Sequence, residues 1–268
     1  MAGRVLALAL AAAVAAASLS APALAAPAPA AHKSVRVYLM RGERLWPVRR
    51  DVGAVAAVGA AAVKSLLLGP TRAEAKAGFT TSIPAHTRFL GLTLRSGVAT
   101  VDLTNRYASG GGSLSMSARL AQVVFTLTQF PSVRTVRFAM NHRAVTVFSG
   151  EGLVLDRPVG RSAYESLAPA VLVEGPLYAD TVRSPLRVWG SANTFEATFY
   201  ERLVGKGGKV LSAGPVKASA GTGTRGSFDF TLRFGTGAAG PATLTVYTIS
   251  AKDGSLGAVM RLPLTLAR

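Results

Sequence analysis

The sequence predicts an α+β N-terminal domain, in which helices cover one side of a mixed sheet, followed by an all-β sandwich. Two observations indicate the first part: apolar residues at helical spacing end at Gly69-Pro70, and two alternating strands follow over 90–103. One observation indicates the second part, because from residue 171 onward the chain consists of short alternating runs that turn residues separate. With 268 residues, the chain is long enough for one large domain or two ordinary ones.

The first domain is expected to open with strands over 35–39 and 45–50, followed by a helix over 53–68 that Gly69-Pro70 ends. Ser96-Gly97 then forms a two-residue turn pair of the kind that joins hairpin strands. This turn predicts three facing apolar pairs, which are Leu94 with Ala99, Leu92 with Val101, and Leu90 with Leu103.

A second helix and a second hairpin follow. Ser113 is predicted as the N-cap of a helix that ends at Phe130-Pro131. The preceding glycines, 110–112, lack the spacing of a phosphate-binding loop, so we interpret them as a flexible connection, with a substrate or partner loop as the alternative. A turn at Asn141-His142 predicts two further facing pairs, which are Phe138 with Val145 and Val136 with Val147.

Residues 1–25 have the pattern of a signal peptide. Arg4 is the only charge before a short apolar run, and Ala23-Leu24-Ala25 predicts cleavage before Ala26. The run is too short and too rich in alanine to favour a retained membrane anchor, and no later stretch is apolar enough to cross a bilayer. We therefore expect a secreted or cell-envelope protein, with residues 26–34 as an extended Ala/Pro linker.

The chain is strongly basic, with a formal net charge of +17. Residues 33–168 carry 18 basic and 7 acidic side chains, and residues 169–268 carry 11 and 6. Such a field favours anionic partners, which outside the cytoplasm are wall polymers, lipid headgroups or acidic proteins. The alternative is that the charge is simply solvated. The basic residues are scattered and form no nucleic-acid-binding motif, so no nucleic-acid partner is expected.

The residue types argue against a catalytic or metal centre. The absence of cysteine excludes disulfides, thiol nucleophiles, cysteine-ligated metals and a lipid-modified cysteine, and three histidines leave little for a metal site. No catalytic serine or zinc-protease motif occurs, and we interpret the nominal triad of Ser115, His86 and Asp102 as chance. The sequence therefore predicts no catalytic residue, no cofactor and no metal.

Glu74 is the carboxylate that most invites a functional interpretation. A single carboxylate without a second one is weak support for acid–base chemistry. We expect a structural role instead, in which Thr71 caps the turn after Pro70 and Glu74 caps the same turn or pairs with Arg72 or Arg88.

The runs LLLGPTRAE, GF-TS-IP and G-AT-VDLT, with the helix AQVVFTLTQFP, resemble the GerMN-type sporulation and spore germination domain. The resemblance covers roughly residues 35 to 150, and we expect the domain to span 35–165. It implies a fold similar to ring-building motifs and a cell-envelope module, with oligomeric or scaffold assembly in some relatives, but no defined chemistry. Its motif positions, expected to be structural, are Gly69, Pro70, Thr71, Glu74, Pro84 and Asp102.

The second domain is expected to contain seven strands, over 171–174, 185–191, 194–202, 208–213, 227–234, 242–250 and 257–266. Trp189 is expected to pack in the core between two sheets, with a ligand platform as the less favoured alternative. Roughly residues 171 to 267 resemble the immunoglobulin-like domain of bacterial spore germination, and we place that domain at 169–268. The residues that carry this resemblance include Val173, Pro176, Ser184-Pro185-Leu186, Gly190, Phe195-Glu196-Ala197, Gly226-Ser227-Phe228 and Leu262-Pro263-Leu264.

Within that second domain, Glu196 is the residue to test for binding, beside the motif residue Phe195. The alternative is a cross-strand pair with Arg187 or Arg233.

Three functions fit these observations. The favoured one is an exported, non-catalytic envelope scaffold or adaptor that binds envelope proteins and forms homo-oligomers in some settings. The second is a basic module that binds wall polymers such as peptidoglycan or teichoic acid. The third, and least favoured, is a wall glycan hydrolase, because the sequence does not supply the paired carboxylates that this chemistry needs.

Overall fold

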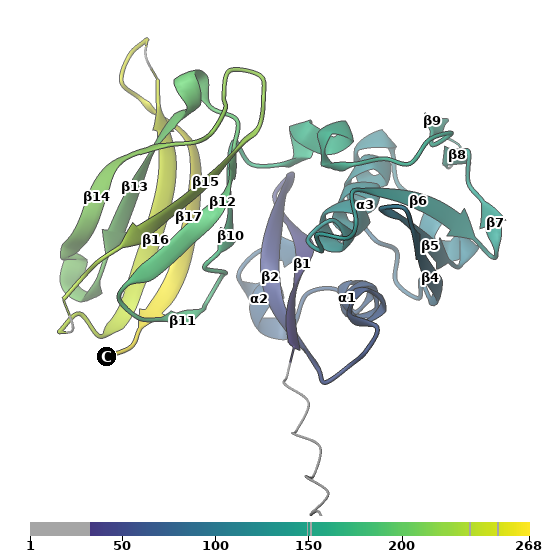
Figure 1. Cartoon of the computed structure of the whole chain (residues 1–268), viewed down its shortest axis with the longest axis horizontal. Helices are drawn as coiled ribbons and strands as arrows, with labels where there is room; N and C mark the ends of the chain where they lie inside the picture. Colours follow the sequence, from purple (N-terminus) through teal and green to yellow (C-terminus); the bar gives the residue numbers. More distant parts are fainter. Residues whose placement is uncertain (1–32, 149, 151, 236, 251) are drawn as a thin grey trace, which may run out of the picture. The chain divides into compact units, whose positions relative to one another are not determined.

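The computed structural model describes residues 33–268 except 149, 151, 236 and 251 (Figure 1). The expected signal peptide and most of the expected linker lie outside the described residues. The described residues all belong to one compact unit. Among the helices of the described residues, none is both long enough and apolar enough to span a membrane.

The strands of the N-terminal region divide into two main sheets. In the first, β1 (Lys33–Arg41) lies between β2 (Arg44–Gly53) and β3 (Phe79–Thr80). The second sheet has the order β4-β5-β6-β7, whose strands are β4 (Phe89–Arg95), β5 (Val98–Leu103), β6 (Thr135–Met140) and β7 (Arg143–Ala144). The expectation of a single mixed sheet with helices on one side is therefore wrong.

The reason for two sheets is the helix α3 (Ser113–Leu127), which is buried on nearly every side. An all-round buried helix must be covered from more than one direction. Accordingly, α3 contacts both β1 and β6, and α1 (Val58–Leu67) contacts both β1 and β4 (Figure 1). Helix α2 (Arg72–Lys76) is short and directly precedes β3.

The first hairpin matches the predicted register for the two pairs nearest the Ser96-Gly97 turn. The third predicted pair is wrong. A bulge in β4 places Phe89 opposite Leu103 and leaves Leu90 exposed.

The second hairpin is shorter than predicted. The pair nearest its turn occurs, because the Val145 amide donates to the Phe138 carbonyl oxygen. The next pair does not form, since β7 ends at Ala144 and Val136 bridges to Val159 instead. The following residues form a separate small sheet of β8 (Val147–Phe148) and β9 (Leu153–Val154). At Val136, the distant residue Val159 therefore takes the place that Val147 of the hairpin was predicted to occupy.

The C-terminal region contains two sheets. The smaller one has the order β10-β12-β15, with β10 (Val171–Gly175), β12 (Leu186–Ala192) and β15 (Gly226–Leu232). The larger one has the order β11-β17-β16-β13-β14, with β11 (Thr181–Val182), β13 (Thr198–Val204), β14 (Val210–Lys217), β16 (Gly240–Ile249) and β17 (Leu256–Leu266). All seven expected strands occur, although β13 begins only at Thr198, and β11 was not predicted.

The two C-terminal sheets pack through their inner faces. The rings of Phe199 in β13 and Phe228 in β15 lie 4.8 Å apart. In β12, Val188 and Gly190 belong to the buried face, so Trp189 between them must point outward. The expectation that Trp189 anchors the core between the sheets is wrong. Its ring instead packs under the Arg36 guanidinium, 4.7 Å away.

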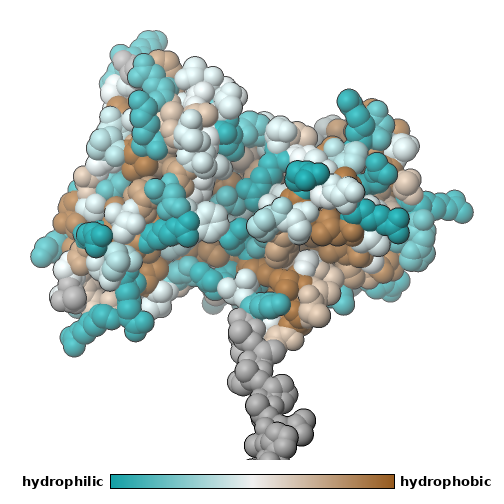
Figure 2. Space-filling model, in the orientation of Figure 1, coloured by the Kyte–Doolittle hydropathy of each residue, from teal (hydrophilic) through white to brown (hydrophobic). Residues whose placement is uncertain are grey.

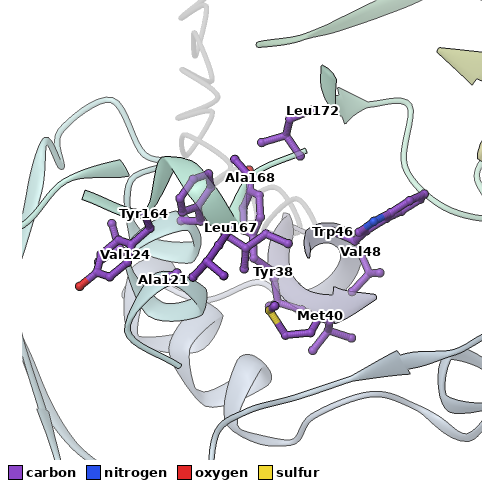
Figure 3. Packing of buried hydrophobic residues seen from close by; sticks show 14 of the residues in the cluster. Tyr38, Met40, Trp46, Val48, Ala121, Val124, Tyr164, Leu167, Ala168 and Leu172 are labelled. Carbon is purple, nitrogen blue, oxygen red and sulfur yellow. The ribbon is translucent and has the colours of Figure 1, made fainter. Parts of the chain in front are cut away.

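Nearly all the buried apolar residues of the described chain form one continuous cluster. Figure 3 shows part of it, where Tyr38, Met40 and Trp46 of the first sheet lie near Leu167 and Ala168. Leu172 of β10 belongs to the same cluster. The apolar core thus runs without interruption from the first sheet through residues 161–168 into β10.

Candidate functional site

The motif from Gly69 to Glu74 forms a helix start. Gly69 has a positive φ of 70°, and Thr71 is the N-cap of α2. The Glu74 amide donates to Thr71 Oγ1 over 3.3 Å, and the Thr71 amide donates to Glu74 Oε2 over 2.7 Å. This reciprocal arrangement is a capping box, which satisfies two amides that the helix itself leaves unpaired.

Glu74 also holds a cation from a distant strand. Arg50 of β2 donates to both carboxylate oxygens, over 2.6 Å and 2.7 Å, and to the Gly69 carbonyl oxygen over 3.2 Å. The expectation that Glu74 pairs with Arg72 or Arg88 is therefore wrong. Arg72 lies two positions from Glu74 on the helix, a spacing at which side chains point to different sides.

These contacts decide the charge of Glu74. Its burial raises the pKa, but hydrogen bonds from Arg50 and Thr71 and the positive charge of Arg50 outweigh that effect and lower the pKa. The carboxylate is thus ionised at neutral pH and fully engaged as a hydrogen-bond acceptor. Its arrangement suits fixing α2 against β2 and does not suit proton transfer.

Pro84 and Asp102 lie in two separate turns. The Pro84 carbonyl oxygen accepts hydrogen bonds from the Thr87 amide and hydroxyl. Asp102 accepts the His142 amide and lies 2.6 Å from His142 Nδ1. Within the nominal triad, Asp102 thus binds His142 rather than His86, and Ser115 Oγ accepts from Arg119.

The glycine-rich loop is held in place by Arg119, a side chain of α3 that is only 2% exposed. Its guanidinium donates to the carbonyl oxygens of Tyr107 and Gly110, over 2.7 Å and 2.8 Å. Gly112, not Ser113 as predicted, occupies the N-cap position of α3. Because the loop presents carbonyl oxygens to a cation, its polarity is the reverse of a phosphate cradle. Hydrogen bonds from Arg119 therefore hold this loop, which we had expected to be a flexible connection.

Phe195 and Glu196 lie in a 3₁₀ turn immediately before β13, and both are exposed. Glu196 has a positive φ of 52°, and its amide donates to Thr222 Oγ1. The expected pairing with Arg187 is wrong, because Arg187 donates to Asp229. Glu196 is not part of a strand, so the cross-strand geometry on which the pairing depended does not exist. Its binding role stays a prediction.

A buried ionic network, which sequence reasoning missed, lies between β1, residue 161 and β10. Glu174 of β10 accepts hydrogen bonds from the Tyr38 hydroxyl and from Arg161 Nη1, the latter over 3.0 Å. Arg161 Nε also donates to Thr128 Oγ1, and its guanidinium lies 4.7 Å from the Phe125 ring. The network therefore joins strands that are more than a hundred residues apart.

The same contacts shift two pKa values. Burial, followed by the negative charge of Glu174, raises the pKa of Tyr38 far above its usual range. Burial lowers the pKa of Arg161, but Tyr38 and Glu174 outweigh this effect and raise it. Tyr38 is thus a permanent donor and Arg161 a permanent cation. No local pattern in the sequence could identify these partners, because each of them is an ordinary residue of its own element.

A groove adjoins this network. Its volume is about 410 Å³. Its lining comprises Arg36, Thr128, Gln129, Val133, Arg134, Arg161, Glu174 and Trp189. Three arginines against one glutamate make it a basic concave surface.

Among the described residues, no group of three or more histidine, cysteine or acidic side chains is placed to hold a metal ion.

Comparison with known proteins identifies two families. Residues 36–146 match the family described as sporulation and spore germination. Residues 170–255 match the immunoglobulin-like domain of bacterial spore germination. A search of curated proteins gave no match.

Solved structures show weaker similarity. A candidate lipoprotein from Clostridium perfringens is 17% identical, with 51% of this chain and 93% of that chain covered and a TM-score of 0.37. The tandem GerMN domains of the sporulation protein GerM from Bacillus subtilis are 13% identical, with 76% and 62% covered and a TM-score of 0.43. The first GerMN domain of the same protein is 18% identical, with 48% and 98% covered and a TM-score of 0.40.

Both family matches confirm the resemblances drawn from the sequence motifs. The chain carries a domain of the sporulation and spore germination family, followed by a domain of the immunoglobulin-like family of bacterial spore germination.

Proposed function

We propose that this protein is an exported, non-catalytic scaffold or adaptor of the cell envelope that binds protein partners. The proposal includes a ring-building-motif-like domain over 35–165 and an immunoglobulin-like sandwich over 169–268. It also includes a signal peptide over 1–25. The two family matches support the envelope assignment, and the side-chain contacts of the described residues support the absence of catalysis.

The observation that carries the proposal is how the carboxylates are used. Among the described residues, five of them accept hydrogen bonds from arginine side chains within the fold, namely Glu74, Glu165, Glu174, Asp180 and Asp229. Glycan hydrolysis needs two carboxylates that face a substrate, and a carboxylate held by a guanidinium is a poor proton donor. The ion pairs thus favour a structural use of these acids.

The surface offers two features for partner binding. The outer edge of β4 pairs with no described strand, and Leu90 and Leu94 on this strand are 38% and 46% exposed. An open strand edge is a template for a strand from another chain. Figure 2 shows hydrophilic side chains scattered over the visible face rather than gathered in one place. This distribution fits a protein surface that contacts partners through several areas.

The experiment is sedimentation velocity of residues 26–268 over a concentration series, with envelope proteins added in parallel. We expect association that the substitution Leu94→Lys weakens, because a charge on an open edge opposes strand pairing. Leu68→Lys is the matched control, since Leu68 is 84% exposed and lies at the end of α1 rather than on an edge. Equal behaviour of both variants would argue against the β4 edge.

Wall-polymer binding is the second candidate, favoured by the surplus of positive charge. Co-sedimentation with purified cell wall across a salt series tests it. The screening length falls from about 10 Å at 0.1 M salt to about 3 Å at 1 M, so binding through exposed charge alone should disappear. Retention at high salt would place wall binding first. Lysis of the wall that Glu74→Gln abolishes would instead show a hydrolase and overturn the proposal.

A further inference from the structure

We propose that the groove beside the Glu174 network is a binding site for a doubly charged oxyanion, such as a phosphate monoester, held by Arg36 and Arg134. This site goes beyond the adaptor function and does not depend on it. The groove has a volume of about 410 Å³, which is ample for a small phosphate ester. Some of its charged groups already have partners within the fold, and others do not.

Arg161 is engaged. It donates to Glu174, to the Tyr38 hydroxyl and to Thr128, and its charge offsets that of Glu174. It also donates to the Phe125 carbonyl oxygen near the C-terminal end of α3, where the helix dipole favours a cation. The charges of Arg161 and Glu174 therefore cancel. Two other arginines, Arg36 and Arg134, remain in the groove.

Arg36 is the less engaged of these two. Its Nε is buried without a hydrogen-bond partner, and Glu174 Oε1 lies 4.0 Å away, beyond hydrogen-bond distance. A buried donor without an acceptor destabilises the fold. Arg36 also lines the groove, and none of its side-chain nitrogens donates a hydrogen bond to a described group, so a ligand oxygen that contacts its guanidinium would supply an acceptor that the fold does not, which makes Arg36 the anchor of the site.

Arg36 is also held in a fixed position. Its backbone amide donates to Gln129 Oε1 over 2.8 Å, and Gln129 Nε2 donates to the Arg36 carbonyl oxygen over 2.6 Å. Its guanidinium lies over the Trp189 ring. Binding by a group that is already ordered loses little side-chain entropy. These contacts therefore prepare the arginine for a ligand and place an indole beside it.

Arg134 provides the second positive charge. Arg134 is one of the residues that line the groove and is exposed, and its guanidinium packs on the Ser96-Gly97 turn, where Nη2 donates to the Ser96 carbonyl oxygen over 2.8 Å. With Arg161 and Glu174 balanced, Arg36 and Arg134 give the lining a charge of +2. A guanidinium binds carboxylate and phosphate oxygens alike, but this charge matches a dianion better than a monoanion. A phosphate monoester carries close to two negative charges above its second pKa of about 6.

The test is fluorescence titration of the mature chain carrying Trp46→Phe, so that Trp189 is the only indole. Glycerol 3-phosphate is the probe at pH 7.5 and constant ionic strength, with dimethyl phosphate as the monoanionic comparison. We expect a saturable change with glycerol 3-phosphate and at least tenfold weaker binding of dimethyl phosphate. Calorimetry on the chain with both tryptophans checks that the substitution itself does not create the signal.

Two variants locate the site. Arg36→Gln and Arg134→Gln should each weaken binding at least tenfold while circular dichroism and Tm remain close to those of the parent. Arg137→Gln removes the same charge from an exposed position on β6 outside the groove and should bind as the parent does. Equal weakening in all three variants, or no saturable change in the parent, would overturn the proposal.

The source of the phosphate is resolved by a last comparison. Vesicles of phosphatidylcholine with phosphatidic acid present the same headgroup charge on a surface. Binding of soluble glycerol 3-phosphate without binding to these vesicles indicates a soluble or polymer-borne phosphate. Vesicle binding that Arg36→Gln abolishes indicates a lipid headgroup. Vesicle binding that Arg36→Gln leaves intact, without soluble binding, contradicts the site.

Discussion

Two buried glutamates in different regions of the molecule have opposite environments. Glu74 is 8% exposed and is held by Arg50 and the capping box. Glu201 of β13 is 5% exposed, accepts one hydrogen bond from Ser212 Oγ over 2.7 Å, and has Oε2 buried without a partner. Burial is nearly the same for both, so the difference must come from the partners.

The consequence is opposite charge behaviour. The contacts with Arg50 and Thr71 overcome the effect of burial and lower the pKa of Glu74. Burial raises the pKa of Glu201, and the hydrogen bond from Ser212 offsets only part of that rise. A carboxylate inside a fold is therefore stabilising or costly according to whether a cation reaches it.

The largest effect is expected on removing the cation from Glu74. Arg50→Ala leaves a buried carboxylate unpaired and should lower the free energy of unfolding by about 3 kcal/mol at pH 7. Arg72→Ala, an exposed arginine in the same helix as Glu74, is the control and should stay within about 0.5 kcal/mol. Urea denaturation measures both. Similar losses for the two variants would show that Arg50 is not the specific partner.

The Glu74 ion pair also predicts a pH dependence. Because the folded-state pKa lies below the ordinary value of 4.5, the stabilisation is complete above 4.5 and is lost as the pH falls through the folded value. The stability difference between the parent and Glu74→Gln should shrink on acidification from pH 6 to pH 3. A difference that stays constant over this range would contradict the assigned charge.

A smaller effect of opposite sign is expected for Glu201. Glu201→Met removes the unpaired buried oxygen and should raise the free energy of unfolding by about 1 kcal/mol at pH 7. The folded-state pKa is raised, so the parent is most stable below 4.5 and loses stability as the pH rises through the folded value. The gain should accordingly fade towards pH 4.

Thermal unfolding at pH 4 and pH 7 measures this gain, with exposed Glu43→Met as the control. A loss of stability at pH 7 would mean that the hydrogen bond from Ser212 outweighs the cost of burying the carboxylate.

The smallest effect is expected for a fully exposed pair. Arg187 and Asp229 form an ion pair on the outer face of β12 and β15, where water screens their charges. Asp229→Asn should leave Tm unchanged within error at both low and high salt. A clear drop in Tm would show that cross-strand pairing contributes more here than solvent screening allows.

Much of the local structure was predictable, because the alternation of apolar and polar residues and the turn residues both involve positions that are close in the sequence. The pairs next to the Ser96-Gly97 turn occur as predicted, and so do the seven strands of the C-terminal region. Predictions failed where a distant segment competed or where a bulge shifted the register. Val136 bridges to Val159 rather than to the nearby strand, and a bulge shifted the end of the first hairpin.

The candidate site was less predictable than the fold. The capping residues Thr71 and Glu74 were singled out from the sequence, but Arg50, their partner across the chain, was not. Trp189 was expected inside the core, although its place between Val188 and Gly190 in a strand already contained the signal that it points outward. Glu201 likewise falls in an alternating series with Phe199 and Leu203, a pattern that indicates a buried acid.

The sequence by itself determined the two families, the seven longer strands of the C-terminal region and the strong positive charge, because each depends on residue order or on composition. Only the tertiary structure decided that α3 separates two sheets and that Glu174 joins Tyr38 to Arg161. It alone left Arg36 with an unpaired buried donor. The physical reason is that partner choice depends on which side chains from distant elements reach the same small volume, and one-dimensional periodicity carries no information about that volume.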